Sequence, residues 1–186
     1  MGVNQTNPWT IKQQQVVYDN PWITVVHHDV TNIAGNDGVY GVVQFKNLAL
    51  GILVLDECND TWLVGQYRFP MDKYTWEIPE GGGLKGVEPL VSAKRELEEE
   101  TGIRAANWEL IQQMQLSNSA TDELAYIYLA RGLSFTTPKP DEGEALQVKK
   151  LPFEEAYQMV LRGDITDSLS VAAILKVKLL FLTGKL

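Results

Sequence analysis

The chain has 186 residues, 45% of them hydrophobic, and its 24 acidic and 16 basic residues give a formal net charge of -8. A chain of this length can bury a core without disulfides, and its single cysteine, Cys58, excludes an internal disulfide and favours a reducing, cytoplasmic location. The acidic balance, with no cluster of Lys and Arg and no apolar stretch long enough to span a bilayer, predicts neither a nucleic-acid partner nor a membrane partner.

The N-terminal part of the chain is typical of β-structure. Segments rich in β-branched and aromatic residues run from about residue 15 to residue 64, with a turn cluster at 31–38. The segment LALGILVLDE (48–57) is almost continuously apolar, as expected of a strand buried on both faces. A further short strand enters a predicted loop of three glycines (81–83), whose backbone can approach a ligand closely.

The second half of the chain mixes helices and strands. A helix is predicted over Pro89–Thr101, because proline suits the first helical turn and Gly102 suits the stop. After it come a strand pair, a polar loop (134–144), a last strand and two helices, the second capped by Thr166, Asp167 or Ser168. This order predicts an α+β or mixed-sheet fold, divided into an N-terminal β element (1–45) and a main domain (46–186).

The helix predicted at 89–101 carries an acidic face beside a narrow apolar stripe. The stripe is formed by Leu90, Ala93 and Leu97. Glu96, Glu99 and Glu100 fall at i, i+3 and i+4, so their carboxylates project from one face, roughly a quarter turn from the stripe. The acidic face therefore lies at the edge of the core rather than on the far, solvated side.

Two interpretations of this acidic face remain open from the residues. Like charges at this spacing destabilise a helix by about 0.2–0.5 kcal/mol per pair, and a bound divalent cation would remove the repulsion. Mg²⁺ takes a few carboxylates and completes its shell with water and substrate phosphates. Taken alone, ELEEE is more often a solvated helix surface, with Arg95 pairing with Glu99. The glycines just upstream favour the metal site for a phosphate-bearing ligand.

The segment RELEEETGI (Arg95–Ile103) resembles the second half of the Nudix box, with Gly81 at the distance of the opening glycine. VGQYRFP, TWEIPEGG and RGDITDSLSVAAI are similar to the ADP-ribose pyrophosphatase-like branch, which includes nucleoside diphosphate sugar hydrolases. The resemblance implies a Nudix fold, a mixed β-sheet sandwiched between helices. It also implies a pyrophosphohydrolase that uses Mg²⁺ or Mn²⁺ to cleave a nucleoside diphosphate sugar, such as ADP-ribose.

The resemblance further implies a metal site. By position, Glu96 and Glu100 correspond to metal ligands. Glu99 corresponds to a further ligand or to the residue that orients the metal-bound water. The backbone carbonyl of Glu80 would join the metal shell, and Arg95 would brace the loop by pairing with a box glutamate.

A general base must lie within hydrogen-bond reach of the attacking water. In this branch a glutamate of a late loop often fills that role, and Glu142 and Glu144 are the candidates here. We favour Glu144, since it directly precedes the last predicted strand. A solvated loop acid is an equally good description of either residue.

Other residues are implied near the substrate or the partner subunit. Arg68 matches a family arginine near the phosphates, which a guanidinium can bind bidentately. Glu77 and Glu123 match acids near the site, although ordinary hydrogen bonding would explain them equally well. The N-terminal strands of this branch often form a homodimer, so the N-terminal β element is expected to be dimer-forming.

Two departures from the family pattern widen the alternatives. Val87 stands where the box has glutamate, with Glu88 beside it, and Asn118 and Ser119 stand where ADP-ribose enzymes commonly carry a proline. The second departure extends the candidate substrates to other nucleotide sugars. The alternatives are hydrolysis of a nucleoside triphosphate or dinucleoside polyphosphate, and a non-catalytic nucleotide-binding Nudix module.

Overall fold

The computed structural model describes residues 6–139, 143 and 145–186. The described residues fall into two compact units. The first contains the residues up to Asn47 together with Gln115–Glu123, and the second contains Leu48–Met114 and Leu124–Leu186. The predicted division into residues 1–45 and 46–186 stays a prediction, because compactness alone does not define an independent domain.

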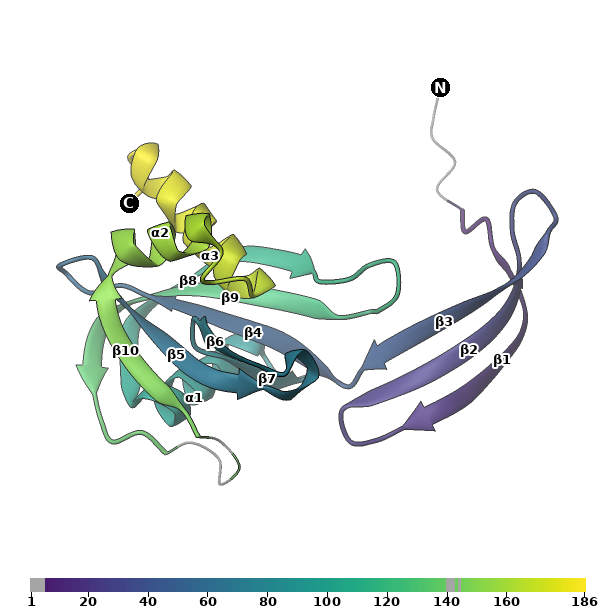
Figure 1. Cartoon of the computed structure of the whole chain (residues 1–186), viewed down its shortest axis with the longest axis horizontal. Coiled ribbons are helices and arrows are strands. Elements are labelled where there is room, and N and C mark those ends of the chain that lie inside the picture. Colours follow the sequence, from purple (N-terminus) through teal and green to yellow (C-terminus); the bar gives the residue numbers. More distant parts are fainter. Residues whose placement is uncertain (1–5, 140–142, 144) are drawn as a thin grey trace. The chain divides into compact units, whose positions relative to one another are not determined.

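The first unit is an antiparallel three-stranded sheet in the order β1-β2-β3 (Figure 1). Its strands are β1 (Thr10–Asp19), β2 (Ile23–Thr31) and β3 (Asp37–Phe45). The strand β1 begins before the expected start near residue 15, because it is exposed along its whole length and its polar sequence carries no apolar alternation. Within the same unit, the Tyr40 hydroxyl donates to the Ser119 carbonyl at 2.6 Å and thereby ties the 115–123 segment to β3.

The second unit contains two sheets, one of four strands and one of three strands. The four-stranded sheet has the order β7-β4-β9-β8, formed by β7 (Glu80–Leu84), β4 (Asn47–Val54), β9 (Leu124–Phe135) and β8 (Ile103–Gln115). The three-stranded sheet has the order β10-β5-β6, formed by β10 (Gln147–Pro152), β5 (Asp60–Arg68) and β6 (Lys73–Glu77). The β4–β9 pair is parallel, whereas β5 is antiparallel to both of its neighbours.

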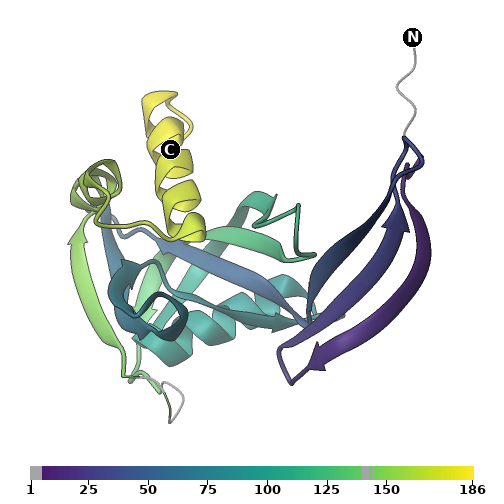
Figure 2. The same cartoon turned by 45° about the vertical axis from the view of Figure 1, so that its right-hand side comes forward.

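Helices cover both sides of these sheets. The helix α1 (Pro89–Thr101) lies on one side, and α2 (Phe153–Arg162) and α3 (Ser168–Leu182) lie on the other (Figures 1 and 2). A single 3-10 turn, η1 (Phe69–Met71), follows β5. The second unit therefore has the predicted α+β arrangement, with a mixed sheet between helices.

The strand β4 is buried on both faces, as its apolar run predicted. Leu50, Ile52 and Val54 share one hydrophobic cluster with Ala93 and Leu97 of α1. On the opposite face, a Cβ placed on Gly51 would lie 3.1 Å from the Leu169 Cδ2 of α3. The central strand thus links the packing of α1 to the packing of α3.

The helix α1 has the predicted bounds. Pro89 occupies the first turn, and Gly102 adopts a left-handed conformation (φ 69°) and donates its N–H to the Glu98 carbonyl at 2.9 Å. A side chain at Gly102 would also overlap the Thr136 carbonyl. Helix geometry and the close passage of a neighbouring segment therefore both require glycine at this position.

The three glycines form the strand β7 rather than the predicted loop. Their backbone pairs with β4 at the edge of the four-stranded sheet. A Cβ on Gly83 would lie 3.0 Å from the Leu50 Cδ1 and 3.3 Å from the Ser92 Cβ of α1. The missing side chains let α1 pack directly against the strand, a tertiary requirement that local turn chemistry does not reveal.

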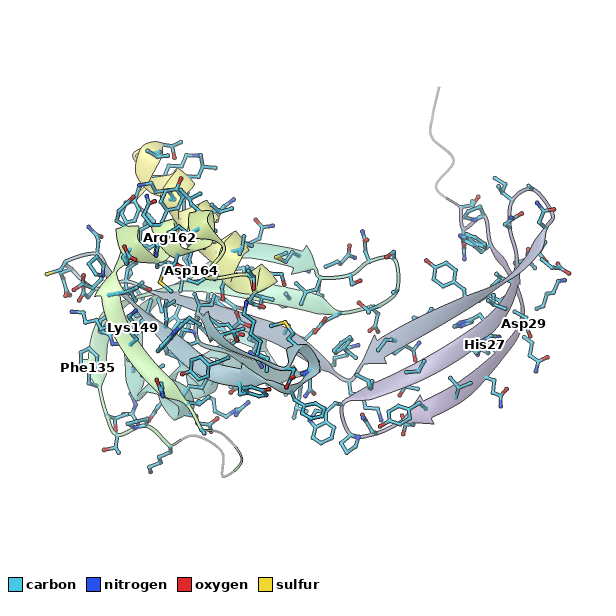
Figure 3. The ribbon with its side chains drawn as sticks, viewed as in Figure 1. His27, Asp29, Phe135, Lys149, Arg162 and Asp164 are labelled. Carbon is cyan, nitrogen blue, oxygen red and sulfur yellow. The ribbon has the colours of Figure 1, made fainter. Side chains whose placement is uncertain are left out.

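The two C-terminal helices have well-defined ends. Arg162, at the end of α2, pairs with Asp164 at 3.0 Å across the turn toward α3 (Figure 3). Asp167 is the N-cap of α3, and its Oδ2 accepts the Ser170 N–H at 2.8 Å. Asp167 was one of the three alternative residues predicted to cap this helix. None of the helices formed by the described residues has the length and apolar character needed to cross a membrane.

Candidate active site

The three glutamates on the acidic face of α1 differ in burial. The side chain of Glu99 is 36% exposed, that of Glu96 is 15% exposed, and Glu100 is only 5% exposed. The face therefore runs from solvent into the protein, as its predicted place beside the apolar stripe required. Burial raises the pKa of Glu96, although the charge of Arg95 opposes this effect.

Glu96 packs directly against the glycine strand. A Cβ placed on Gly81 would overlap the Glu96 carboxyl group and come within 2.5 Å of its Oε2. Gly81 therefore leaves the space in which the first carboxylate of the acidic face lies. This close approach explains the glycine more directly than a need for an unusual backbone conformation.

Glu100 reaches the same strand one residue earlier. Its Oε2 accepts the backbone N–H of Glu80 at 3.1 Å. The carboxylates of Glu96 and Glu100 thus flank the Glu80–Gly81 peptide. Two acids that are a helical turn apart in α1 converge on one peptide of β7.

Arg95 connects the remaining groups. Its Nη2 donates to Glu96 Oε1 at 2.6 Å and to the Gly82 carbonyl at 3.2 Å, and its Nη1 donates to Glu99 Oε2 at 2.5 Å. The predicted brace is therefore present. Arg95 holds the glycine strand against α1 while it neutralises two carboxylates.

A second charged group lies at the end of β5. Arg68 Nε is 3.0 Å from Glu77 Oε2 and 3.1 Å from Glu77 Oε1, and Arg68 Nη2 also contacts Oε2. Glu77 is buried and accepts a further hydrogen bond from the Thr75 hydroxyl at 2.5 Å. Because the Arg68 side chain is 37% exposed, its guanidinium is anchored on one side and open on the other.

The side chain of Glu80 points toward α3. Its Oε1 accepts the Ser170 hydroxyl at 3.0 Å, and its carboxyl group is hydrogen-bonded to that of Asp167. Burial, together with the negative charges of Asp167 and Glu77, raises the pKa of Glu80 well above its usual range. Burial would also raise the pKa of Asp167, but hydrogen bonds from Glu80 and Ser170 hold it below its ordinary value. The pKa values of the two neighbouring acids are therefore shifted in opposite directions.

Residues 46–170, which contain all of these groups, match the NUDIX domain. The chain belongs to the Nudix family. This family was predicted from Arg95–Ile103 and from the spacing of Gly81, and both segments lie inside the matched range.

Individual relatives agree with this assignment. The chain is 33% identical over 167 residues to an ADP-ribose pyrophosphatase of Bacillus subtilis, and the aligned residues make up 89% of each chain. It is 35% identical over 167 residues to the methanol dehydrogenase activator of Bacillus methanolicus, again with 89% of each chain covered. The predicted likeness to the ADP-ribose pyrophosphatase branch is therefore confirmed.

A solved structure shares the fold. A crystal structure of an ADP compounds hydrolase superimposes with a TM-score of 0.86 over 98% of both chains, at 21% sequence identity. At this identity the likeness concerns the fold alone. It confirms the predicted Nudix fold, including the N-terminal strands that precede the matched family range.

The residues around Gly81 fit a hard divalent cation by their chemistry. Glu96, Glu99 and Glu100 offer carboxylate oxygens and Glu80 offers a backbone carbonyl, the donors that Mg²⁺ and Mn²⁺ prefer. As the described side chains stand, no three of His, Cys, Asp or Glu are grouped closely enough to hold a metal. Glu96 and Glu99 are both paired with Arg95 in this structure. The metal roles of these four residues stay predictions.

The first residues of the predicted base loop (134–144) are hydrogen-bonded to α1 and to the residue that ends it. The Lys139 N–H donates to the Glu99 carbonyl at 2.8 Å, and the Thr136 N–H donates to the Gly102 carbonyl at 2.7 Å. A cavity of about 360 Å³ lies here, lined by Lys94, Arg95, Glu98, Glu99, Thr137 and Lys139. Both candidate bases, Glu142 and Glu144, lie outside the described residues. Their role as the base stays a prediction.

Glu123 and the start of α3 are the remaining parts of the site to compare with the prediction. Glu123 belongs to the unit that contains β1–β3, and its substrate-binding role stays a prediction. Sequence reasoning missed Ser170 and treated Asp167 only as a helix cap. The available signal was the Asp–x–x–Ser spacing at the start of α3, inside the segment RGDITDSLSVAAI that resembles the family.

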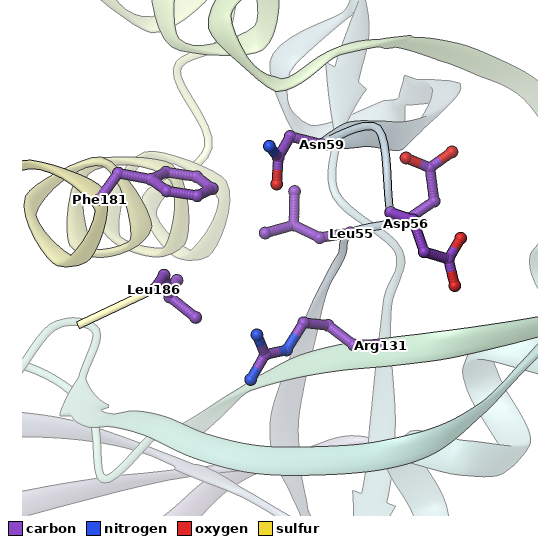
Figure 4. A pocket seen from close by; sticks show the side chains of 7 residues that line it. Leu55, Asp56, Asn59, Arg131, Phe181 and Leu186 are labelled. Carbon is purple, nitrogen blue, oxygen red and sulfur yellow. The ribbon is translucent and has the colours of Figure 1, made fainter. Parts of the chain in front are cut away.

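Another cavity of the second unit contains none of the predicted site residues. It measures about 260 Å³ and is lined by Leu55, Asp56, Glu57, Asn59, Arg131, Phe181 and Leu186 (Figure 4). Its main feature is the turn after β4, where Asp56 pairs with Lys150 of β10 at 2.8 Å. We assign this contact a structural role.

Proposed function

We propose that this chain is a divalent-metal-dependent hydrolase that cleaves the diphosphate bond of a nucleoside diphosphate sugar, with ADP-ribose as the first candidate. Water attacks one phosphorus atom and the bond from that phosphorus to the bridging oxygen breaks. The products are a nucleoside monophosphate and a sugar phosphate. The single observation that carries the proposal is the convergence of Glu96 and Glu100 on the Glu80–Gly81 peptide.

The chain's residues have separate tasks in this proposal. Glu96, Glu100 and the Glu80 carbonyl would hold Mg²⁺ or Mn²⁺, with Glu99 as a further ligand. The bound cation would neutralise the phosphoryl oxygens and make a water molecule nucleophilic. Arg68, held by Glu77, would direct its exposed edge to the substrate phosphates.

A base must accept the proton of the attacking water. Glu144 is our first candidate and Glu142 the second, both on the polar loop predicted at 134–144. The hydrogen bond between Lys139 and Glu99 supports this role, because it fixes the start of the loop beside α1. Glu123 is a further candidate for substrate binding.

The proposal also covers the oligomeric state and the cellular location of the enzyme. We propose a homodimer formed through the β1–β3 sheet, whose first strand exposes Ile11, Val16, Val17 and Tyr18. Apolar side chains gathered on an exposed strand favour a partner surface. A cytoplasmic location is proposed from the single cysteine.

A substrate panel tests the reaction. ADP-ribose, GDP-mannose, UDP-glucose, a nucleoside triphosphate and a dinucleoside polyphosphate would be incubated with Mg²⁺ or Mn²⁺, and the products separated by anion-exchange chromatography. Release of a nucleoside monophosphate and a sugar phosphate supports the proposal. Turnover of the triphosphate or polyphosphate alone would favour the second substrate class. Nucleotide binding without any turnover would favour the non-catalytic module.

A further inference from the structure

The link between β6 and β7 is held by three different elements. It consists of Ile78 and Pro79, and it passes from the three-stranded sheet to the four-stranded one. The Ile78 N–H donates to Ser170 Oγ of α3 at 2.9 Å, and the Pro79 carbonyl accepts the Ile52 N–H of β4 at 2.9 Å. The following N–H, that of Glu80, donates to Glu100 of α1.

Ser170 is the contact that α3 makes with this link. It is fully buried, with 0% of its surface exposed. Its hydroxyl donates its one hydrogen to Glu80 Oε1 and accepts the Ile78 N–H. The hydroxyl therefore holds the segment 78–80 at both ends, at Ile78 through the backbone and at Glu80 through its side chain.

The side chain of Glu80 completes the connection. It lies between the Ser170 hydroxyl and Asp167, the N-cap of α3. The first turn of α3 is thus hydrogen-bonded to both the start and the end of the segment 78–80. Because buried polar groups must find partners, this arrangement leaves the Glu80 peptide little freedom to rotate.

We propose that Ser170 and the side chain of Glu80 are positioning residues, which fix the orientation of the Glu80 backbone carbonyl for the divalent cation. The inference rests on the proposed function, since the carbonyl is assigned to the metal there. Neither side chain is among the groups that we assign to the substrate. Their effect passes through the backbone, in the way that outer-shell partners orient the direct ligands of a metal.

Metal binding tests this role separately from turnover. The probe is Mn²⁺, and its free concentration would be followed by electron paramagnetic resonance during a titration of the full chain. We expect Ser170→Ala and Glu80→Ala to weaken Mn²⁺ binding by about 10-fold or more, the usual effect of losing an outer-shell partner. Glu80→Gln keeps an acceptor for Ser170 and a donor for Asp167, so it should rescue most of the affinity that Glu80→Ala loses.

Ser168→Ala is the matched control. It makes the same substitution on the same helix, at an exposed position two residues away. The melting temperature of each variant is measured without metal, to separate positioning from a general loss of stability. A merely structural role would lower the melting temperature of Ser170→Ala and Glu80→Ala. It would not produce weaker Mn²⁺ binding that Glu80→Gln rescues.

The possible outcomes are distinct. Weaker Mn²⁺ binding by Ser170→Ala and Glu80→Ala, with rescue by Glu80→Gln, supports the inference. Wild-type affinity in Ser170→Ala and Glu80→Ala overturns it while the proposed function stands. Equal loss in Glu80→Gln and Glu80→Ala also overturns it, since the hydrogen bonds would then not matter. Absence of Mn²⁺ binding by the wild type overturns both the metal assignment and this inference.

Discussion

The carboxyl group of Glu96 lies in the space that a side chain on Gly81 would need. The two residues are on different elements, α1 and β7, and the Glu96 Oε2 would be 2.5 Å from a Cβ on Gly81. A methyl group there must displace either the carboxylate or the strand. This steric relationship makes the glycine as important to the acidic face as the glutamates themselves.

Gly81→Ala should therefore reduce metal-dependent turnover while the protein remains folded. The displaced Glu96 would bind Mn²⁺ more weakly, and we expect a loss of kcat of about 10-fold or more, the scale on which metal sites respond to displaced groups. Turnover and Mn²⁺ titration check the effect. Gly38→Ala is the control, because a Cβ there would meet nothing within 4 Å. Full activity in Gly81→Ala would contradict the role of Glu96.

Glu100→Gln should abolish metal-dependent turnover with little change in the fold. The amide can still accept the Glu80 N–H, so the contact between α1 and β7 survives while the negative charge is lost. The measurement is hydrolysis at saturating Mg²⁺ together with circular dichroism. Glu98→Gln is the matched control, since Glu98 is on the same helix but pairs outward with Arg104 at 2.5 Å. A Glu100→Gln variant that kept most of the wild-type rate would remove this residue from the metal site.

Arg68→Ala should affect both stability and substrate binding. It leaves the buried Glu77 carboxylate without its guanidinium, and because Arg68 is 37% exposed we expect a loss of about 1–3 kcal/mol, less than for a fully buried pair. The KM for a nucleotide sugar should also rise. Calorimetry and steady-state kinetics measure the two effects. Arg68→Lys keeps the charge without the bidentate geometry, so an intermediate KM is expected.

Glu144→Gln should lower kcat with little change in Mn²⁺ affinity, because a base acts on the water rather than on the cation. We expect a decrease of about 10²-fold or more, the range of general base catalysis. Glu142→Gln, two residues away in the same loop, is the comparison. A loss confined to Glu142→Gln would transfer the role to that residue. Wild-type kcat in both variants would move the base elsewhere.

Asp56→Asn should destabilise the protein in a pH-dependent way. Burial would raise the pKa of Asp56, but the Lys150 ammonium and the N–H groups of Asp60 and Cys58 hold it below its ordinary value. A carboxyl whose folded pKa is depressed adds stability above the unfolded pKa, near 3.8, and that stability is lost as the pH falls through the folded value. The free energy of unfolding of the wild type should therefore be higher than that of the variant at pH 7. The two free energies should become similar at pH 3.

The size of this effect is modest, because the Lys150 side chain is 47% exposed. We expect about 1 kcal/mol at pH 7, which corresponds to about 2–4 °C in Tm for a chain of this size. Thermal unfolding at several pH values provides the measurement. Asp164→Asn, which breaks an exposed pair with Arg162, should have no such effect. A constant difference between wild type and Asp56→Asn from pH 7 to pH 3 would contradict the explanation.

Several elements of the fold could be predicted because their signals are local. The bounds of α1 follow from Pro89 and Gly102, whose backbone preferences do not depend on distant residues. The two buried faces of β4 follow from its continuous apolar run. The start of β1 could not be predicted, because an exposed strand needs no alternation of apolar residues.

The sequence by itself determined the acidic face, the family and the residue types of the candidate metal site. Each depends on a fixed spacing along one helix or one short segment, and helical geometry converts that spacing into a shared face. Only the tertiary structure decided what the face meets. That Gly81 makes room for Glu96, and that Ser170 holds the Glu80 segment from α3, depends on strand and helix packing between residues up to 92 positions apart in the chain.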